Sequence, residues 1–439
     1  MEASTAGSVS RRSILLAGLW GTVLGGAALA ACGPAGAPGT AGGPGGGAAP
    51  KRMTIGFTAS QTGSLTTESK RQLQGLQLWV DDVRKAGGIK LKDGPATPEL
   101  KFYDDESKAD RVQALYTKLI TDDKVDVLIS PYSSGLTQTA AVVAEQYGKV
   151  MITTGAASDT TMEQGFRNIF QLYTPASRYL TGAVDMLQRL NASLKRLAIV
   201  HEKDRFSTDV ATATQTYAKG KGYDIVLFEG YDTGTVDFSP FISKIQAARP
   251  DAIMGGGHFQ DGTTFAKQLY EKNVPVRLVA LLVAPPEPTF AEIGDAAQYV
   301  VGPSQWEPVA RYSQESARAA GVPWYGISID DFVKAYQARF GEEPSYHAAG
   351  GYAAGLILQK GLEEAGAIDN ERLRSALARL DLLTFYGRVK FDQAAKTFGK
   401  QIGHEMVYIQ WQKDASGRLV KPVVWPPEGK SADPQLRPV

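Results

Sequence analysis

Residues 125–136 read Val-Asp-Val-Leu-Ile-Ser-Pro-Tyr-Ser-Ser-Gly-Leu. The nearly continuous apolar run from Val125 to Ile129 is typical of a β-strand that is buried on both faces. A short Ser- and Gly-containing loop, Pro131 to Gly135, follows the strand, and the pattern predicts a helix from Leu136. Strand, short loop and helix in this order are the repeating unit of an α/β fold with parallel strands.

The same unit recurs along most of the chain. Apolar segments of strand length alternate with helix-length segments whose apolar residues recur at helical spacing. The predicted strands are 53–57, 100–103, 125–129, 150–152, 197–200, 224–228, 252–254 and 278–282. Because they fall into two consecutive sets, we predict an α/β fold with two doubly wound, Rossmann-like lobes.

In an open parallel sheet, a ligand binds beyond the carboxyl ends of the strands. This rule selects seven loops: 60–63, 104–106, 131–135, 153–158, 202–206, 255–259 and 284–287. They are rich in Ser, Thr, Gly and aromatic residues, which suits a small polar solute held in a cleft between the lobes. Ser133 and Ser134 precede a predicted helix, and free N–H groups at a helix N-terminus favour a carboxylate. An ordinary helix cap is the alternative interpretation of these two serines.

The composition limits the classes of partner. The 439 residues carry a formal net charge of +1, so the basic surface of a nucleic-acid-binding protein is not expected. The single cysteine, Cys32, allows neither an internal disulfide nor a cysteine cluster for a metal.

The N-terminal residues have the pattern of an export signal. Arg11 and Arg12 precede an apolar run from Ile14 to Ala31, and Cys32 follows directly. The alternative is a permanent membrane helix. The tetrad ending in Cys32 resembles the lipobox of bacterial lipoproteins, which implies a cleaved signal peptide (1–31) and an acylated Cys32. The Arg pair resembles a twin-arginine signal, and both Tat and Sec export stay open. Residues 32–52 are rich in Gly, Pro and Ala, and we expect a flexible tether there.

Sequence motifs for catalysis are weak. Gly255-Gly256-Gly257 lacks the third glycine of a dinucleotide fingerprint, because Gln260 stands there, and Ser133 and Ser134 lie in no G-x-S-x-G elbow. Asp104 and Asp105 could imitate a catalytic pair, but we expect them to organise their loop and cap the next helix. We predict no enzyme activity and no cofactor.

The histidines also show no spacing typical of a metal site. The four are His201, His258, His347 and His404. They are far apart in the sequence, and none forms a pattern such as H-E-x-x-H. We therefore predict no metal. His258 follows a predicted strand, so it either lines the cleft or has a structural role.

A series of short motifs resembles the leucine/isoleucine/valine-binding protein family, the type I periplasmic binding proteins. In chain order the motifs are 55–63, Gly75, 86–89, 103–107, 131–134, 152–158, 237–239 and 249–251. The resemblance extends from about residue 53 to about residue 425. It implies two lobes joined by three crossing strands: lobe one from 53–174 and 306–395, lobe two from 175–305 and 396–426, and a tail at 427–439.

The resemblance also implies a function. Family members are extracytoplasmic, and they deliver a small solute to the permease and ATPase subunits of an ABC importer. On this basis we expect a monomeric, lipid-anchored substrate-binding subunit that takes up an amino acid, an amide or an aromatic acid, with a branched-chain or hydrophobic amino acid favoured. A ligand sensor that feeds a receptor or regulator is the alternative.

Ligand contacts are carried over residue by residue. The resemblance implies that the Ser134 hydroxyl and backbone N–H groups near Ala156 and Ala157 hold a ligand carboxylate, and that the ring of Phe206 packs on the ligand. Three positions depart from the pattern. Ala157 replaces a threonine, for which Ser158 could substitute, and Glu68 replaces an aromatic residue. Glu287 is the candidate acid for a ligand ammonium, and if it points away, an amide or an aromatic acid becomes the expected ligand.

Overall fold

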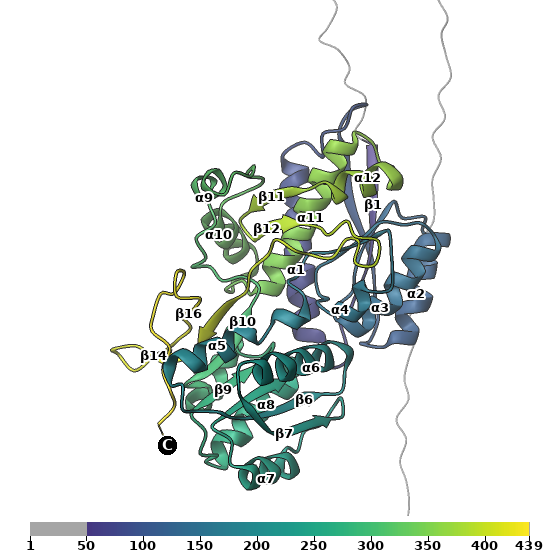
Figure 1. Cartoon of the computed structure of the whole chain (residues 1–439). Helices are drawn as coiled ribbons and strands as arrows, with labels where there is room; N and C mark the ends of the chain where they lie inside the picture. Colours follow the sequence, from purple (N-terminus) through teal and green to yellow (C-terminus); the bar gives the residue numbers. More distant parts are fainter. Residues whose placement is uncertain (1–50, 439) are drawn as a thin grey trace, which may run out of the picture. The chain divides into compact units, whose positions relative to one another are not determined.

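The computed structural model describes residues 51–438, which form two lobes, each built on one sheet (Figure 1). The predicted signal peptide, Cys32 and the tether up to residue 50 lie outside the described residues. Sheet one has the order β2-β1-β3-β4-β5, and all its strand pairs are parallel. Its strands are β1 (Lys51–Ala59), β2 (Ala96–Asp104), β3 (Val127–Ile129), β4 (Met151–Thr153) and β5 (Ile169–Gln171). We call this sheet and its helices lobe one.

Sheet two, the centre of lobe two, has the order β16-β13-β10-β9-β8-β6-β7. Its strands are β6 (Arg196–Glu202), β7 (Asp224–Tyr231), β8 (Ala252–Gly256), β9 (Leu278–Leu281), β10 (Val300–Ser304), β13 (Val407–Gln410) and β16 (Val423–Trp425). Strands β6 to β9 are parallel, as predicted. Strand β10, which is not among the predicted strands, also pairs in parallel, whereas β13 and β16 add an antiparallel edge. These two short strands lie far along the chain from the rest of their sheet, and no local pattern assigns them to it.

Helices cover both faces of sheet one, which explains the continuous apolar strand at its centre. Val127 and Ile129 pack into the core shared with α1 (Thr66–Lys85) and α11 (Tyr346–Ala365). Leu128, between them, packs on the opposite face with α2 (Ala109–Thr121) and α3 (Ser134–Gln146). Lobe one also contains α4 (Asp159–Met162), α9 (Gln314–Ala319), α10 (Ile329–Phe340), α12 (Asn370–Ala378) and the hairpin β11 (Asp381–Thr384) and β12 (Gly387–Lys390).

Lobe two carries its own helices: η1 (Ala176–Arg178), α5 (Thr181–Leu190), α6 (Arg205–Gly220), α7 (Ser239–Ala248), α8 (Phe259–Glu271) and η2 (Pro288–Ala297). Strands β14 (Gln412–Lys413) and β15 (Leu419–Val420) form a small hairpin between β13 and β16. The C-terminal residues then lie along this lobe, where the backbone carbonyls of Asp433 and Gln435 accept hydrogen bonds from Gln412 and Gln410.

The two long helices of lobe one lie side by side at close range (Figure 1). A methyl group added at Gly75 would lie 1.9 Å from the carbonyl oxygen of Ala348, and one added at Gly351 would lie 2.1 Å from that of Gln72. The two backbones therefore touch, and glycine is required at both positions.

The chain passes between the lobes after β5, after β10 and before β13, and side chains join these three segments. Gln305 Oε1 accepts a 3.0 Å hydrogen bond from Thr174 N, and Thr174 Oγ1 lies 2.7 Å from His404 Nδ1. The imidazole of His404 in turn lies 3.0 Å from the carbonyl oxygen of Tyr386 through Nε2. The connections are thus held together at one place, while the predicted boundaries at 174/175, 305/306 and 395/396 stay a prediction.

Asp104 and Asp105 hold the loops at the end of lobe one. The Asp105 carboxylate accepts hydrogen bonds from Thr58, Ser60 and the Ser107 backbone, and that of Asp104 accepts from Gln61 and Thr62. The expectation that they organise this region is confirmed. The expectation that they cap the next helix is wrong, because Lys108 occupies the N-cap of α2 and makes no side-chain cap.

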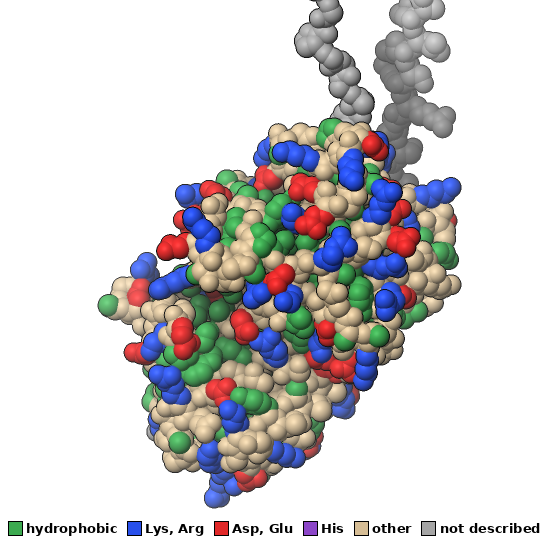
Figure 2. Space-filling model, turned by 45° about the horizontal axis from the view of Figure 1, so that its top comes forward, with side chains coloured by type: hydrophobic (Ala, Val, Ile, Leu, Met, Phe, Trp, Pro, Cys, Tyr) green, Lys and Arg blue, Asp and Glu red, His purple; other side chains and the backbone are tan. Residues whose placement is uncertain are grey.

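On the face drawn in Figure 2, basic and acidic side chains are interspersed. This agrees with the small net charge. Among residues 51–438, no helix is both long and apolar enough to cross a membrane.

Candidate ligand-binding site

A small cavity, with a volume of about 10 Å³, lies where the strand ends of the two sheets meet. Its walls come from segments that follow β3, β4 and β5 of sheet one and β6, β8 and β9 of sheet two. The lining residues are Tyr132, Ser133, Ser134, Gly155, Ala157, Tyr173, Tyr179, Phe206, His258, Val283 and Tyr346. The position agrees with the rule for open parallel sheets.

Five predicted site residues line this cavity: Ser133, Ser134, Ala157, Phe206 and His258. The other four, Ala156, Ser158, Glu68 and Glu287, are not among the lining residues. Sequence reasoning missed the four tyrosines of the wall, Tyr132, Tyr173, Tyr179 and Tyr346. Tyr132 belongs to the loop 131–135, which the strand-end rule selects, so the sequence could have identified it as a lining residue. Tyr346 is the first residue of α11, far along the chain from the strands of sheet one.

Ser134, the first residue of α3, has an unusual hydrogen-bonding pattern. Its Oγ accepts from the backbone N–H groups of Ala157 at 3.1 Å and Ser158 at 3.2 Å. Because those two bonds use its acceptor positions, the hydroxyl proton is the group left to donate. In residues 51–438 no acceptor for this proton lies within hydrogen-bond distance. The side chain borders the cavity, so a ligand oxygen there would be an acceptor.

Ser158 is turned toward the other lobe. Its Oγ donates a 2.6 Å hydrogen bond to Asp209 of α6 and caps α4 by accepting from Thr161 N. The same Asp209 oxygen accepts from Thr160 N at 3.2 Å and Thr160 Oγ1 at 3.0 Å. The Ser158 hydroxyl therefore holds the lobes together, and it is not free to replace the family threonine as a ligand contact.

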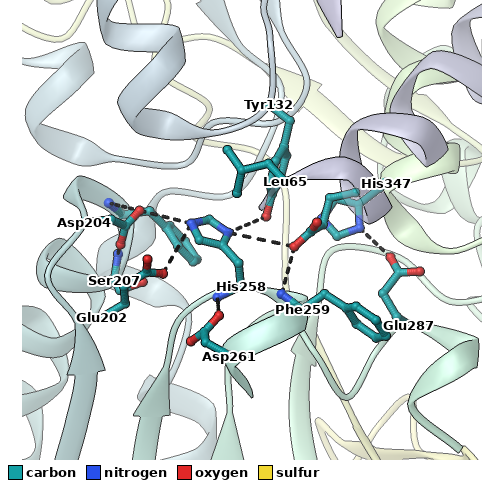
Figure 3. A network of polar contacts seen from close by, with 12 residues as sticks. Leu65, Tyr132, Glu202, Asp204, Ser207, His258, Phe259, Asp261, Glu287 and His347 are labelled. Atoms are coloured by element: carbon teal, nitrogen blue, oxygen red, sulfur yellow. Dashed lines mark hydrogen bonds and ion pairs between the residues drawn. The ribbon is translucent and has the colours of Figure 1, made fainter. Parts of the chain in front are cut away.

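The two predicted acids have different surroundings. Glu287 is fully buried, and one of its oxygens lies 2.6 Å from His347 Nδ1 (Figure 3). Its other oxygen lies 3.7 Å from Arg71 Nε. Burial raises the pKa of Glu287, but the hydrogen bond and charge of His347, with the charge of Arg71, hold it below its usual value. Its negative charge is thus compensated by these two neighbours, although its Oε2 accepts no hydrogen bond within residues 51–438.

Glu68 of α1, in lobe one, forms a hydrogen bond with lobe two. Its Oε1 accepts a 2.8 Å hydrogen bond from Phe259 N, at the start of α8. Its Oε2 is buried and has no hydrogen-bond partner in the described part of the chain. Burial raises the pKa of Glu68 above its usual value.

His258 occupies the boundary between the lobes (Figure 3). Its Nδ1 lies 2.8 Å from the hydroxyl of Tyr132 in lobe one, and its Nε2 lies 3.1 Å from Asp204 in lobe two. Burial lowers the pKa of His258, but the hydrogen bond and charge of Asp204, with Glu202 and Glu68, raise it to about 10. Burial raises the pKa of Glu202 to about 7. His258 therefore both lines the cavity and bridges the lobes.

Two α/β lobes whose strand ends converge on one small cavity define a protein that captures a solute between its halves. The sequence pattern described as "Periplasmic binding protein" matches residues 52–416, so the chain belongs to the periplasmic binding protein family. This confirms the family and the fold that the short motifs predicted.

Curated relatives are named as amino-acid-binding proteins or as homologues of them. "Leu/Ile/Val-binding protein homolog 8" of Brucella melitensis is 26% identical over 376 residues, which cover 82% of this chain and 87% of that protein. The "Leucine-, isoleucine-, valine-, threonine-, and alanine-binding protein" of Pseudomonas aeruginosa is 24% identical over 372 residues, covering 84% and 92%.

Solved structures share the fold. The substrate-binding protein of a branched-chain amino acid transporter from Streptococcus pneumoniae, in complex with isoleucine, has a TM-score of 0.68 and 21% identity, covering 85% of this chain and 100% of that one. A solute-binding protein of an ABC transporter from R. palustris, in complex with benzoate, has a TM-score of 0.69 and 19% identity, covering 88% and 97%.

Proposed function

We propose that this chain is the extracytoplasmic solute-binding subunit of an ABC importer and that it captures a small carboxylate, either an amino acid or an amino-acid-like acid. The observation that carries the proposal is the Ser134 hydroxyl at the N-terminus of α3, whose proton has no acceptor among residues 51–438 and borders the cavity. The names of the curated relatives support an amino acid as ligand.

The binding mode follows from the cavity wall. A carboxylate oxygen accepts from the Ser134 hydroxyl, which the N–H groups of Ala157 and Ser158 polarise by donating to its oxygen. The positive end of the α3 dipole stabilises the same charge. Phe206, whose ring centroid is 4.9 Å from that of Tyr179, packs on the apolar part of the ligand with the surrounding tyrosines.

Capture requires the lobes to close. Ligand contacts to both lobes favour the closed arrangement in proportion to the difference in affinity between closed and open forms. Contacts between the lobes, such as Ser158 with Asp209 and Glu68 with Phe259, add to this preference. The permease subunits then recognise the closed protein, and the ATPase subunits drive uptake.

An aromatic acid is the second candidate ligand. An ammonium group needs an unmatched carboxylate, yet Glu287 is already paired with His347 and Arg71. Glu68 keeps one buried oxygen without a partner in the described region, but it is not part of the cavity wall. The tyrosine-rich wall and the benzoate complex of the R. palustris protein favour an aromatic acid.

A ligand screen separates these candidates. We expect one class to raise the unfolding temperature, because a ligand at a hundredfold excess over its Kd stabilises the native state by about 2.7 kcal/mol. The screen compares hydrophobic amino acids, their amides, and benzoate derivatives. A failure of both acid classes, the amino acids and the benzoate derivatives, to stabilise the protein would contradict a carboxylate-binding function.

Mutation of Ser134 tests the binding mode. Ser134→Ala should weaken binding of the acid by about 1.5 to 3 kcal/mol, the range for a hydrogen bond to a charged group, which is about a tenfold to hundredfold loss. An amide analogue should lose less, because the charge-assisted part is absent. The matched control is Phe206→Ala, which removes ring packing and should weaken acid and amide equally. Calorimetric titration with unchanged acid affinity in Ser134→Ala would refute the assignment.

The remaining parts of the proposal concern the membrane anchor, the oligomeric state and catalysis. We propose that Cys32 is acylated after removal of residues 1–31, that the chain works as a monomer, and that it carries out no catalysis. Cys32→Ser should release the protein from membranes or leave the signal uncleaved. Mass spectrometry that finds an unmodified Cys32 in a retained N-terminal segment would overturn the anchor. Conversion of a bound solute to a product would overturn the assignment as a binding protein.

A further inference from the structure

We propose that Glu202, Asp204 and His258 form a binding site for one divalent transition-metal ion at the edge of the ligand cavity. The three side chains come from adjoining strand ends: Glu202 ends β6, Asp204 is the N-cap of α6, and His258 follows β8, which pairs with β6. One donor atom from each residue lies within 4.8 Å of the other two. The proposal goes beyond solute binding and does not depend on which solute is captured.

The distances fit a shared ion. His258 Nε2 lies 3.1 Å from Asp204 Oδ2 and 3.9 Å from Glu202 Oε2 (Figure 3). A zinc ion binds imidazole nitrogen and carboxylate oxygen at about 2.0–2.2 Å. Donor atoms at these separations therefore need only small side-chain rotations to meet one ion, which would replace the proton on Nε2.

Glu202 supplies independent evidence for a cation site. The residue is 4% exposed, and its Oε2 has no hydrogen-bond partner among residues 51–438. A buried carboxylate oxygen without a donor destabilises the fold, because its hydrogen bonds to water are lost and no hydrogen bond within the protein replaces them. The open oxygen is turned toward His258 rather than toward solvent.

The charges around the cluster are unbalanced. In the described part of the chain, His258 is the one basic residue within 4.0 Å of the carboxylates of Glu202 and Asp204. Lys203, between them in sequence, pairs with the exposed Asp232. Asp261 adds another carboxylate nearby, since its Oδ2 and the Oε2 of Glu202 both border Gly257. A divalent cation would favour the ionised form of these carboxylates and compensate their charge.

A second cavity gives access to the cluster. It has a volume of about 220 Å³ and is lined by Glu202, His258 and Asp261 together with hydroxyl-bearing residues of both lobes: Ser64, Thr233, Thr235 and Thr264. An ion could enter by this route and keep a water ligand on the cavity side. One imidazole with two carboxylates favours Zn²⁺, Co²⁺ or Mn²⁺ over Ca²⁺.

Sequence spacing could not reveal this cluster. The prediction of no metal rested on the histidines being far from one another, but here a single histidine meets two acids from a different strand. On the far side of the ring, Nδ1 lies 2.8 Å from the Tyr132 hydroxyl, which fixes the orientation of the imidazole as in many metal sites.

Metal titration of the full, untagged chain tests the proposal. After chelator treatment, Zn²⁺ and Co²⁺ are added, stoichiometry is measured by elemental analysis, and affinity is measured by chelator competition. We expect one ion per chain and a visible Co²⁺ spectrum. Glu202→Gln and Asp204→Asn, which keep the side-chain shape, should each lower affinity at least about tenfold. The control Asp232→Asn, which changes an exposed acid of the same lobe, should bind as wild type.

Two results would overturn the site. One is the lack of stoichiometric uptake by the wild-type chain, and the other is equal affinity in wild type and in both variants of the cluster. Thermal unfolding of each variant shows whether it is folded. The solute screen is run in parallel without metal, so that failure of solute binding is distinguished from failure of metal binding.

Discussion

His404 should make the stability of this protein depend on pH, and the effect can be worked out before any ligand is known. The side chain is fully buried where the three connections between the lobes meet. Its Nε2 faces the carbonyl oxygen of Tyr386, which can only accept, so Nε2 carries the proton of the neutral ring. Nδ1 then accepts from the Thr174 hydroxyl.

The direction of the effect follows from the shift in pKa. Burial, with a smaller contribution from the charge of Arg178, lowers the pKa of His404 to about 4, although its hydrogen bond to Tyr386 opposes this. The unfolded chain has a histidine pKa of about 6.5. Between these values the unfolded state binds a proton that the folded state does not, so stability falls as the pH decreases from about 6.5 to about 4. A difference of about 2.5 pKa units corresponds to about 3 kcal/mol.

The substitution His404→Gln isolates this contribution, because an amide can also donate to Tyr386 and accept from Thr174 without titrating. Urea unfolding of both proteins is measured at several pH values between 7 and 4. We expect the free energy of unfolding of wild type, minus that of the variant, to fall by about 3 kcal/mol across this range. A difference that stays constant with pH would refute the reasoning, since other titrating groups affect both proteins alike.

Three further outcomes are expected. Gly351→Ala should lower the free energy of unfolding by about 3 kcal/mol, because the added methyl group would meet the backbone of α1. The control Gly220→Ala adds its methyl group in open space and should change this free energy little. Equal melting temperatures of the two variants would contradict the close approach of the helices. Asp209→Asn should weaken ligand binding about tenfold in calorimetry with little change in the unfolding temperature, because its charge-assisted bonds join the lobes. Arg71→Met should lower the free energy of unfolding, measured by chemical denaturation, by about 3 kcal/mol, because the buried charge of Glu287 loses its neighbouring cation. Adding Glu287→Gln should recover part of this loss. No recovery in the double variant would argue against the pair.

The sequence predicted the repeating part of the fold well because each parallel strand carries its own local signal. Val127, Leu128 and Ile129 are all apolar since both faces of sheet one are covered, and this continuous run is visible without a structure. Strands β13 and β16 carry no comparable signal. They are short, and their place at the edge of sheet two is decided by partners far along the chain.

The candidate site was predictable in position but not in detail. The strand-end rule placed Ser134, Phe206 and His258 at one cavity, because the rule depends on topology alone. It could not predict that the Ser158 hydroxyl would donate to Asp209 or that Glu287 would be hydrogen-bonded to His347. Those pairings depend on side-chain directions between elements that are distant in sequence.

The start of β1 has a mechanical consequence for a protein held by its N-terminus. Lys51 opens β1, whereas the cavity lies beyond the carboxyl ends of the strands, so the chain enters lobe one at the pole away from the ligand. Nine strand residues at about 3.3 Å each separate Lys51 from the loop after Ala59 by roughly 30 Å. An anchor at Cys32 would therefore pull on lobe one alone, from behind. Lobe two, along which the C-terminal residues lie, would carry no force from the anchor when it moves relative to lobe one.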